Sequence, residues 1–113
     1  MLHCCGHLAA VLPLAIEAGF DAVQPIAACN DVPAIAAAAR GRIALAGTID
    51  VGSVLVRGAP ADVASAVRAD WGSYGPAGVV IGSNHSINNA VPLENLRALA
   101  RAVADLRAEE QRT

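Results

Sequence analysis

The chain alternates short apolar runs with longer stretches in which apolar residues recur every three or four positions. Runs of the first kind are typical of buried strands, and stretches of the second kind are typical of helices. We expect the end of one strand at residues 1–2, followed by three more strands at 21–26, 43–49 and 79–81. Because these runs are apolar almost throughout, they favour a parallel sheet that is covered by helices.

Four helices are expected between and after these strands, over 7–18, 31–40, about 60–71 and from about 92 onward. Gly19 is suited to end the first helix, and Asp31 is a good N-cap for the second. The last helix carries one apolar stripe, made up of Leu93, Leu96, Leu99, Val103 and Leu106. Its polar end, over 109–113, is expected to fray.

Strand and helix therefore alternate four times, which predicts an α/β fold with parallel strands. A complete (β/α)8 barrel needs about 250 residues for eight such units, so four units correspond to roughly half a barrel. Only two residues precede His3, so the first strand looks cut, and we expect residues 1–113 to be one partial domain, the C-terminal half of a TIM barrel. Two open sheet edges also predict that the isolated chain is not a stable monomer, and that it joins a second copy or a missing N-terminal half.

Composition narrows the functional classes. Hydrophobic residues make up 55% of the chain but aromatic residues only 3%, which predicts a thin aliphatic core. The 8 basic residues are all arginine, and 10 acidic residues give a net charge of −2, so nothing attracts nucleic acid or an anionic membrane by charge.

The longest apolar stretch is interrupted by Pro13 and is shorter than the roughly 20 residues that span a bilayer. Without a basic and apolar leader, we expect a cytoplasmic protein.

The residues best suited to chemistry follow the expected strands. His3 and Cys5 lie two positions apart in an extended segment, so their side chains point the same way, and His85 follows the last strand. The carboxyl ends of parallel strands meet on one face, and a thiolate with imidazoles is a ligand set that zinc favours. The sequence therefore predicts a zinc site made by His3, Cys5 and His85. The alternative is that Cys5 is a small buried residue and that His3 ends the strand.

Two further polar residues reach the same face. Asp50 follows the third strand, where it binds substrate or orients a ligand histidine, or else caps the following turn. Gln24 follows the second strand, where it hydrogen-bonds a substrate or cofactor, or else shapes the turn. We expect Cys4 and Cys29 to be packing residues.

A series of short motifs runs through nearly the whole chain. In order they are His-x-Cys-Gly at 3–6, Glu-Ala-Gly-Phe-Asp-Ala-Val-Gln-Pro at 17–25, Gly-Arg-Ile at 41–43, Ala-Gly-Thr-Ile-Asp at 46–50, His-Ser-Ile at 85–87 and Pro-Leu-Glu-Asn at 92–95. Together they resemble the uroporphyrinogen decarboxylase superfamily, which holds haem-pathway decarboxylases and cobalamin-dependent methyltransferases. Both branches are built on (β/α)8 barrels.

The resemblance implies two different activities. In the methyltransferase branch a His-x-Cys-Gly motif and a later cysteine bind zinc, which activates a thiol as methyl acceptor; His3 and Cys5 match this motif, and His85 stands where the later cysteine would be. A histidine at that position is instead similar to the decarboxylase branch, where it lies in the porphyrinogen pocket. The leading hypothesis is zinc-dependent methyl transfer to a small thiol from a corrinoid carried by a partner protein. The alternatives are decarboxylation of a tetrapyrrole and a non-catalytic remnant.

Overall fold

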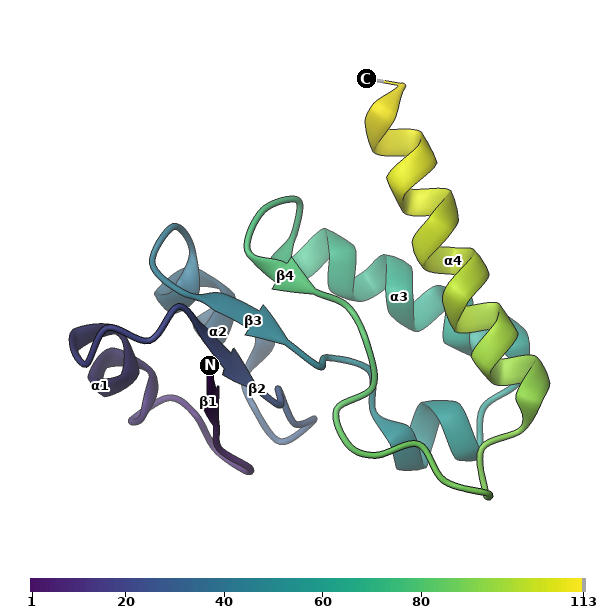
Figure 1. The fold of residues 1–113 in the computed structure, drawn as a ribbon, viewed down its shortest axis with the longest axis horizontal. Helices are drawn as coiled ribbons and strands as arrows, with labels where there is room; N and C mark the ends of the chain where they lie inside the picture. The colour runs from purple at the N-terminus through teal and green to yellow at the C-terminus, as the bar shows by residue number, and fades with distance from the viewer. Residues whose placement is uncertain (113) are drawn as a thin grey trace.

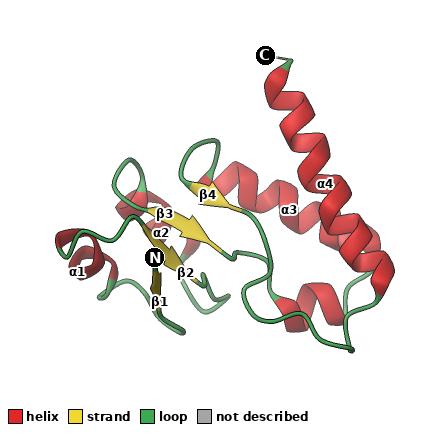
Figure 2. Ribbon diagram, viewed as in Figure 1, coloured by secondary structure: helices red, strands yellow, loops and turns green. Residues whose placement is uncertain are grey.

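The computed structural model describes residues 1–112, which form one parallel four-stranded sheet flanked by helices (Figure 1). The strands β1 (Leu2–His3), β2 (Ala22–Gln24), β3 (Ala44–Ala46) and β4 (Val79–Val80) lie side by side in chain order. The helical segments are α1 (Leu12–Glu17), α2 (Val32–Ala39), the π-helical η1 (Val51–Val56), α3 (Pro60–Tyr74) and α4 (Leu93–Gln111) (Figure 2). This arrangement is that of half a (β/α)8 barrel, as the strand–helix alternation predicted.

The register of the sheet sorts the strand residues into two rows. One row packs into the core and consists of Leu2, Val23, Leu45 and Val79. Side chains alternate along a strand, so the other row, on the opposite face, consists of His3, Gln24, Ala46 and Val80. Val80, in this second row, is 62% exposed. In a closed barrel the second face is the one that points inward.

The hydrophobic core is divided into two clusters. The first is centred on Val23 and Leu45 of the sheet and is covered by side chains of α1 and α2, together with Tyr74 at the end of α3. The second gathers apolar side chains of η1, α3 and α4, with Leu55, Val63 and Val67 fully buried. Alanine supplies many of the contacts, as the low aromatic content predicted.

The first helix is much shorter than expected from the sequence. A helix was predicted over 7–18, whereas α1 begins only at Leu12. Gly6 adopts a positive φ of 83°, and the backbone N–H of Leu8 donates to the side chain of Asn30, so this segment is held as a loop. Pro13 then occupies the first turn of α1, where its missing N–H is harmless.

The strands are also shorter than predicted. The run at 21–26 contributes only β2, the run at 43–49 only β3, and the run at 79–81 only β4, while β1 includes His3. Beyond β3 the chain bends at Gly47, whose φ is 71°, and a single bridge then joins Ile49 to Ser83. A Cβ at Gly47 would lie 3.0 Å from the carbonyl oxygen of Ser83, so glycine permits the close approach of these two segments.

Three helical features differ from expectation. The π-helical η1 was not predicted, and it begins where the Asp50 side chain accepts from the N–H of Ser53. Helix α3 continues through Gly72 to Tyr74, where a glycine loop was predicted after residue 71. Helix α4 continues to Gln111, so its polar end is helical where fraying was expected, and Thr113 lies outside the described residues.

The prediction that α4 buries one apolar stripe is only partly confirmed. Leu93 is 57% exposed, whereas Asn95 is buried and donates to the backbone carbonyls of Leu55 and Gly58. The helix is thus tied to the end of η1 by an amide as well as by apolar packing. None of the helices among residues 1–112 is both long enough and apolar enough to cross a bilayer.

Candidate functional site

The carboxyl ends of the four parallel strands lie together at one end of the sheet, which we call the rim. His3 and Gln24 are the last residues of β1 and β2, and Asp50 and His85 follow β3 and β4. Because the strands are parallel, all the residues predicted for the site lie at the rim. The distances between them decide which ones act together.

His3 and Cys5 form a close pair on the rim. The His3 Nε2 atom lies 3.5 Å from the Cys5 Sγ atom, and both residues are exposed. Cys4 turns the other way and packs against the first core cluster. The predicted alternation is thus confirmed, and Cys4 is a packing residue as expected. Cys29 is exposed, so the expectation that it packs was wrong, because it lies in the turn before Asn30 rather than under a helix.

Gln24 completes the arrangement around His3. Its Oε1 atom lies 2.9 Å from His3 Nδ1. An amide oxygen only accepts hydrogen bonds, so this contact needs the proton on Nδ1, and in the neutral ring it leaves the lone pair of Nε2 toward the Cys5 thiol. Metal-binding histidines are commonly oriented in this way by a partner on the second ring nitrogen. Gln24 therefore positions His3, a role that the sequence did not predict for it, and its predicted contact with a substrate or cofactor stays a prediction.

Asn30 fixes the loop that carries Cys5. Its side chain is buried, and its Oδ1 atom accepts from the N–H of Leu8 at 2.8 Å while its Nδ2 atom donates to the carbonyls of Gly6 and Ala27 at 3.0 Å each. The loops after β1 and β2 are thereby joined through one amide. Sequence reasoning missed this residue, and its only signal was an asparagine in a loop directly before a helix cap.

Asp50 caps η1, which is the structural alternative the sequence left open. Its Oδ2 atom accepts from the backbone N–H of Ser53 at 2.7 Å and from the Ser53 hydroxyl at 2.6 Å, and its Oδ1 atom accepts from Asn84 at 2.9 Å. Chiefly the two bonds from Ser53, together with Asn84 and the charge of Arg57, hold the pKa of the Asp50 carboxyl below its ordinary value despite partial burial. Asp50 is thus an anion on the rim, and its predicted contact with substrate stays a prediction.

His85 does not join the His3–Cys5 pair. It is exposed, and no group of three or more His, Cys, Asp or Glu side chains within residues 1–112 is arranged to hold a metal ion. The neighbouring Asn84 is buried and accepts from the N–H of Val51, so the loop after β4 is anchored beside Asp50. The described chain therefore brings two of the three predicted ligands together and leaves the third apart, because β1 and β4 are at opposite edges of the sheet.

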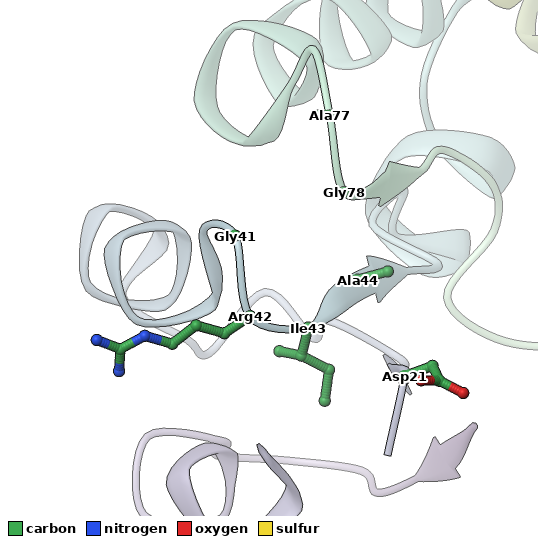
Figure 3. Close-up of a pocket in the computed structure, with 7 residues that line it drawn as sticks. All are labelled: Asp21, Gly41, Arg42, Ile43, Ala44, Ala77 and Gly78. Carbon is green, nitrogen blue, oxygen red and sulfur yellow. The ribbon is translucent and has the colours of Figure 1, made fainter. Parts of the chain in front are cut away.

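A separate hollow of about 250 Å³ lies at the opposite end of the sheet (Figure 3). It is lined by residues that precede or begin the strands, among them Asp21, Arg42 and Gly78. The side chains of Asp21 and Arg42 point away from each other there. In barrels of this kind residues at the amino ends of strands serve stability, so the rim remains the candidate site.

Comparison with known protein families gives one clear result. The family model described as uroporphyrinogen decarboxylase (URO-D) matches residues 1–106. Searches of curated proteins and of solved structures found no match. The match covers all four strands, the rim and most of α4. We conclude that this chain belongs to the uroporphyrinogen decarboxylase family.

Proposed function

We propose that this chain is part of an enzyme that transfers a methyl group to a small thiol, with His3 and Cys5 as two of the ligands of a zinc ion. The observation that carries the proposal is the 3.5 Å approach of His3 Nε2 and Cys5 Sγ, with His3 Nδ1 bonded to Gln24. Both donor atoms are chemically suited to zinc, and the exposure of both residues leaves room for a substrate ligand. Family membership is compatible with this activity.

Each residue of the site has a distinct task under this proposal. Cys5 loses its proton and offers a thiolate, and His3 offers the lone pair of Nε2 while Gln24 holds the ring in that orientation. A bound zinc ion supplies the chemistry of lowering the pKa of a coordinated thiol, so that the thiol is ionised at neutral pH. The proposed methyl donor is a corrinoid on a partner protein, which approaches from the open rim.

Zinc binding to the reduced 113-residue chain tests the proposal directly by isothermal titration calorimetry. We expect about one equivalent of zinc per site and an affinity that falls with acidity, because coordination releases the thiol proton. Cys5→Ser is expected to weaken binding at least tenfold. Cys29→Ser and Cys4→Ser are matched controls, the first exposed like Cys5 and the second adjacent to it but turned into the core. Equal losses in Cys5→Ser and in either control would contradict the assignment.

His85 separates the two activities of the family. Its exposed position on the rim, apart from the His3–Cys5 pair, favours decarboxylation of a tetrapyrrole as the second candidate function, with His85 as a hydrogen-bonding group in the substrate pocket. If His85 is instead the third ligand, His85→Ala lowers zinc affinity by tens of fold or more and His85→Cys restores it, since thiolate suits zinc. Under the decarboxylase alternative both variants bind zinc like the wild type.

A further inference from the structure

The His3–Cys5 pair has the spacing of two zinc ligands but lacks a third. Zinc bonds of about 2.1 Å to nitrogen and about 2.3 Å to sulfur place the two donor atoms about 3.6 Å apart in a tetrahedral site. His3 Nε2 lies 3.5 Å from Cys5 Sγ, so the pair is already spaced for one zinc ion. A catalytic zinc site has three protein ligands. Within residues 1–112 no group of three His, Cys, Asp or Glu side chains is arranged to hold a metal ion, so the third ligand is missing.

His85 of the same chain is held at the far edge of the sheet. It follows β4, whereas His3 ends β1, and these two strands are the opposite edges (Figure 1). Neighbouring strands are spaced about 4.8 Å apart, so the edges are about 14 Å apart along the sheet. Asn84 donates to Asp50 and accepts from the N–H of Val51, which anchors the loop after β4 beside β3. His85 therefore starts from a fixed point near β3 and β4.

Both edge strands lack the features that protect an open edge. Neither β1 nor β4 contains a proline or a Lys, Arg, Asp or Glu residue, which would hinder pairing with another strand. Five of the seven large apolar side chains that are exposed within residues 1–112 lie on the units at these edges. They are Met1 and Leu14 on the side of β1, and Val80, Ile87 and Leu93 on the side of β4. Both edges are therefore suited to be covered by a strand with its helix.

A second copy of the chain fits both edges at once. The sheet has four parallel strands, and a barrel of this kind closes with eight. Two copies related by a two-fold axis along the barrel would pair β4 of each copy with β1 of the other, which makes two identical junctions and leaves no open edge. His85 would then follow the strand that lies one spacing, about 4.8 Å, from the strand of the partner's His3.

On the basis of the proposed function, we propose that two copies of this chain close into one eight-stranded barrel, in which His85 of each copy completes the partner's His3–Cys5 pair. The carboxyl ends of all the strands then lie on one rim, because paired strands run parallel across both junctions. Each zinc ion has two imidazoles and one thiolate as ligands, drawn from two chains, and keeps its fourth position for the substrate thiol. One copy alone provides only the pair.

Complementation between two defective variants tests the shared site. Cys5→Ser and His85→Ala are produced together with different affinity tags, the mixed dimer is purified through both tags, and zinc affinity is measured by competition with a coloured chelator. Each variant alone is expected to bind zinc at least tenfold more weakly than the wild type. The mixed dimer should regain wild-type affinity at one of its two sites, because one chain supplies the intact His3–Cys5 pair and the other supplies His85.

The matched control is the mixed dimer of the wild type with the double variant that carries both substitutions. In the closed barrel each site of this dimer lacks either Cys5 or His85, so tight binding should be lost at both. A site built within one chain would instead survive in the wild-type copy. The proposal is overturned if the first mixture gains no affinity over its parents, or if the control keeps one tight site.

Cross-linking tests the arrangement of the chains without zinc. In a chain with Cys4→Ser and Cys29→Ser, Val80→Cys adds a thiol on the β4 edge and Cys5 keeps its thiol beside β1. A short bis-maleimide should give a covalent dimer from this chain, and none when either thiol is removed. A covalent dimer from a chain with only one of the thiols overturns the closed barrel, as does the absence of any cross-link. Absence of zinc binding by a wild type that does cross-link refutes the proposed function instead, and with it the role of His85.

Discussion

Replacing Asn30 by alanine removes the side chain that joins the loops after β1 and β2. The buried N–H of Leu8 then loses its acceptor, and leaving such a donor unpaired costs about 1–3 kcal/mol. The bonds from Asn30 Nδ2 to the carbonyls of Gly6 and Ala27 are lost as well, each worth about 0.5–1.5 kcal/mol. We therefore expect Asn30→Ala to lower the free energy of unfolding by about 2–6 kcal/mol, a large part of the stability of a small domain.

The assay is urea unfolding followed by circular dichroism at one fixed protein concentration, so that assembly affects all variants equally. Asn30→Asp is the informative comparison, because it keeps an acceptor for Leu8 but turns a buried carboxylate oxygen toward the carbonyls of Gly6 and Ala27. It should be strongly destabilised at pH 7 and recover toward acidic pH, where the protonated carboxyl group can donate. Asn89→Ala is the control, since Asn89 is exposed. A midpoint for Asn30→Ala that matches this control would refute the role given to the amide. Zinc affinity should fall with the same variant if Cys5 depends on the anchored loop.

Four further outcomes are expected. Gly47→Ala should lower the free energy of unfolding by about 1–3 kcal/mol, measured by urea unfolding, because its φ is 71° and the new Cβ meets the Ser83 carbonyl at 3.0 Å. The lowered pKa of Asp50 adds stability above the unfolded-state value of about 3.9, and this stability disappears as the pH falls through the folded-state pKa. The urea midpoints of Asp50→Asn and the wild type should thus converge at acidic pH. A difference between the two midpoints that does not change with pH would contradict the stabilising role of the Asp50 carboxylate as the cap of η1. The raised pKa of Asp70 has the opposite sign, so Asp70→Asn should unfold at an equal or higher urea concentration than the wild type at pH 7, with the gap closing toward pH 4. Sedimentation velocity should show the folded chain in an assembly of two or more copies, since β1 and β4 are edge strands and Val80 is exposed; a compact monomer that unfolds cooperatively would contradict this.

The sequence was most informative where the signal is local. Asp31 caps α2 through the N–H of Ala34 as its residue type predicted, and the alternation of side chains placed His3 beside Cys5. It was least informative where one distant residue decides the outcome. The start of α1 depends on Asn30, which lies 22 positions from Leu8 and leaves no periodic trace.

The same limit applies to the site. The topology correctly brought four polar residues to one rim, but whether His85 reaches His3 depends on the curvature of the sheet and on the path of the loop after β4. Neither is encoded in a short motif. The roles of Asn84 and Asn95 were hidden for a related reason, because an asparagine that bonds backbone groups 33 to 40 residues away resembles any loop or helix-start residue in sequence.

Helix α3 contributes to both clusters of the core, so its two ends should differ in local unfolding. Tyr74, at its end, packs with α1, α2 and the sheet, whereas Val63 and Val67 pack with η1 and α4. Unfolding of α4 exposes only the second cluster. The amide hydrogens of η1 and α4 should therefore exchange with solvent through a local unfolding of lower free energy than the unfolding that exposes β2 and β3. The amides of α3 should divide between the two rates within a single helix, with Tyr74 among the slow ones.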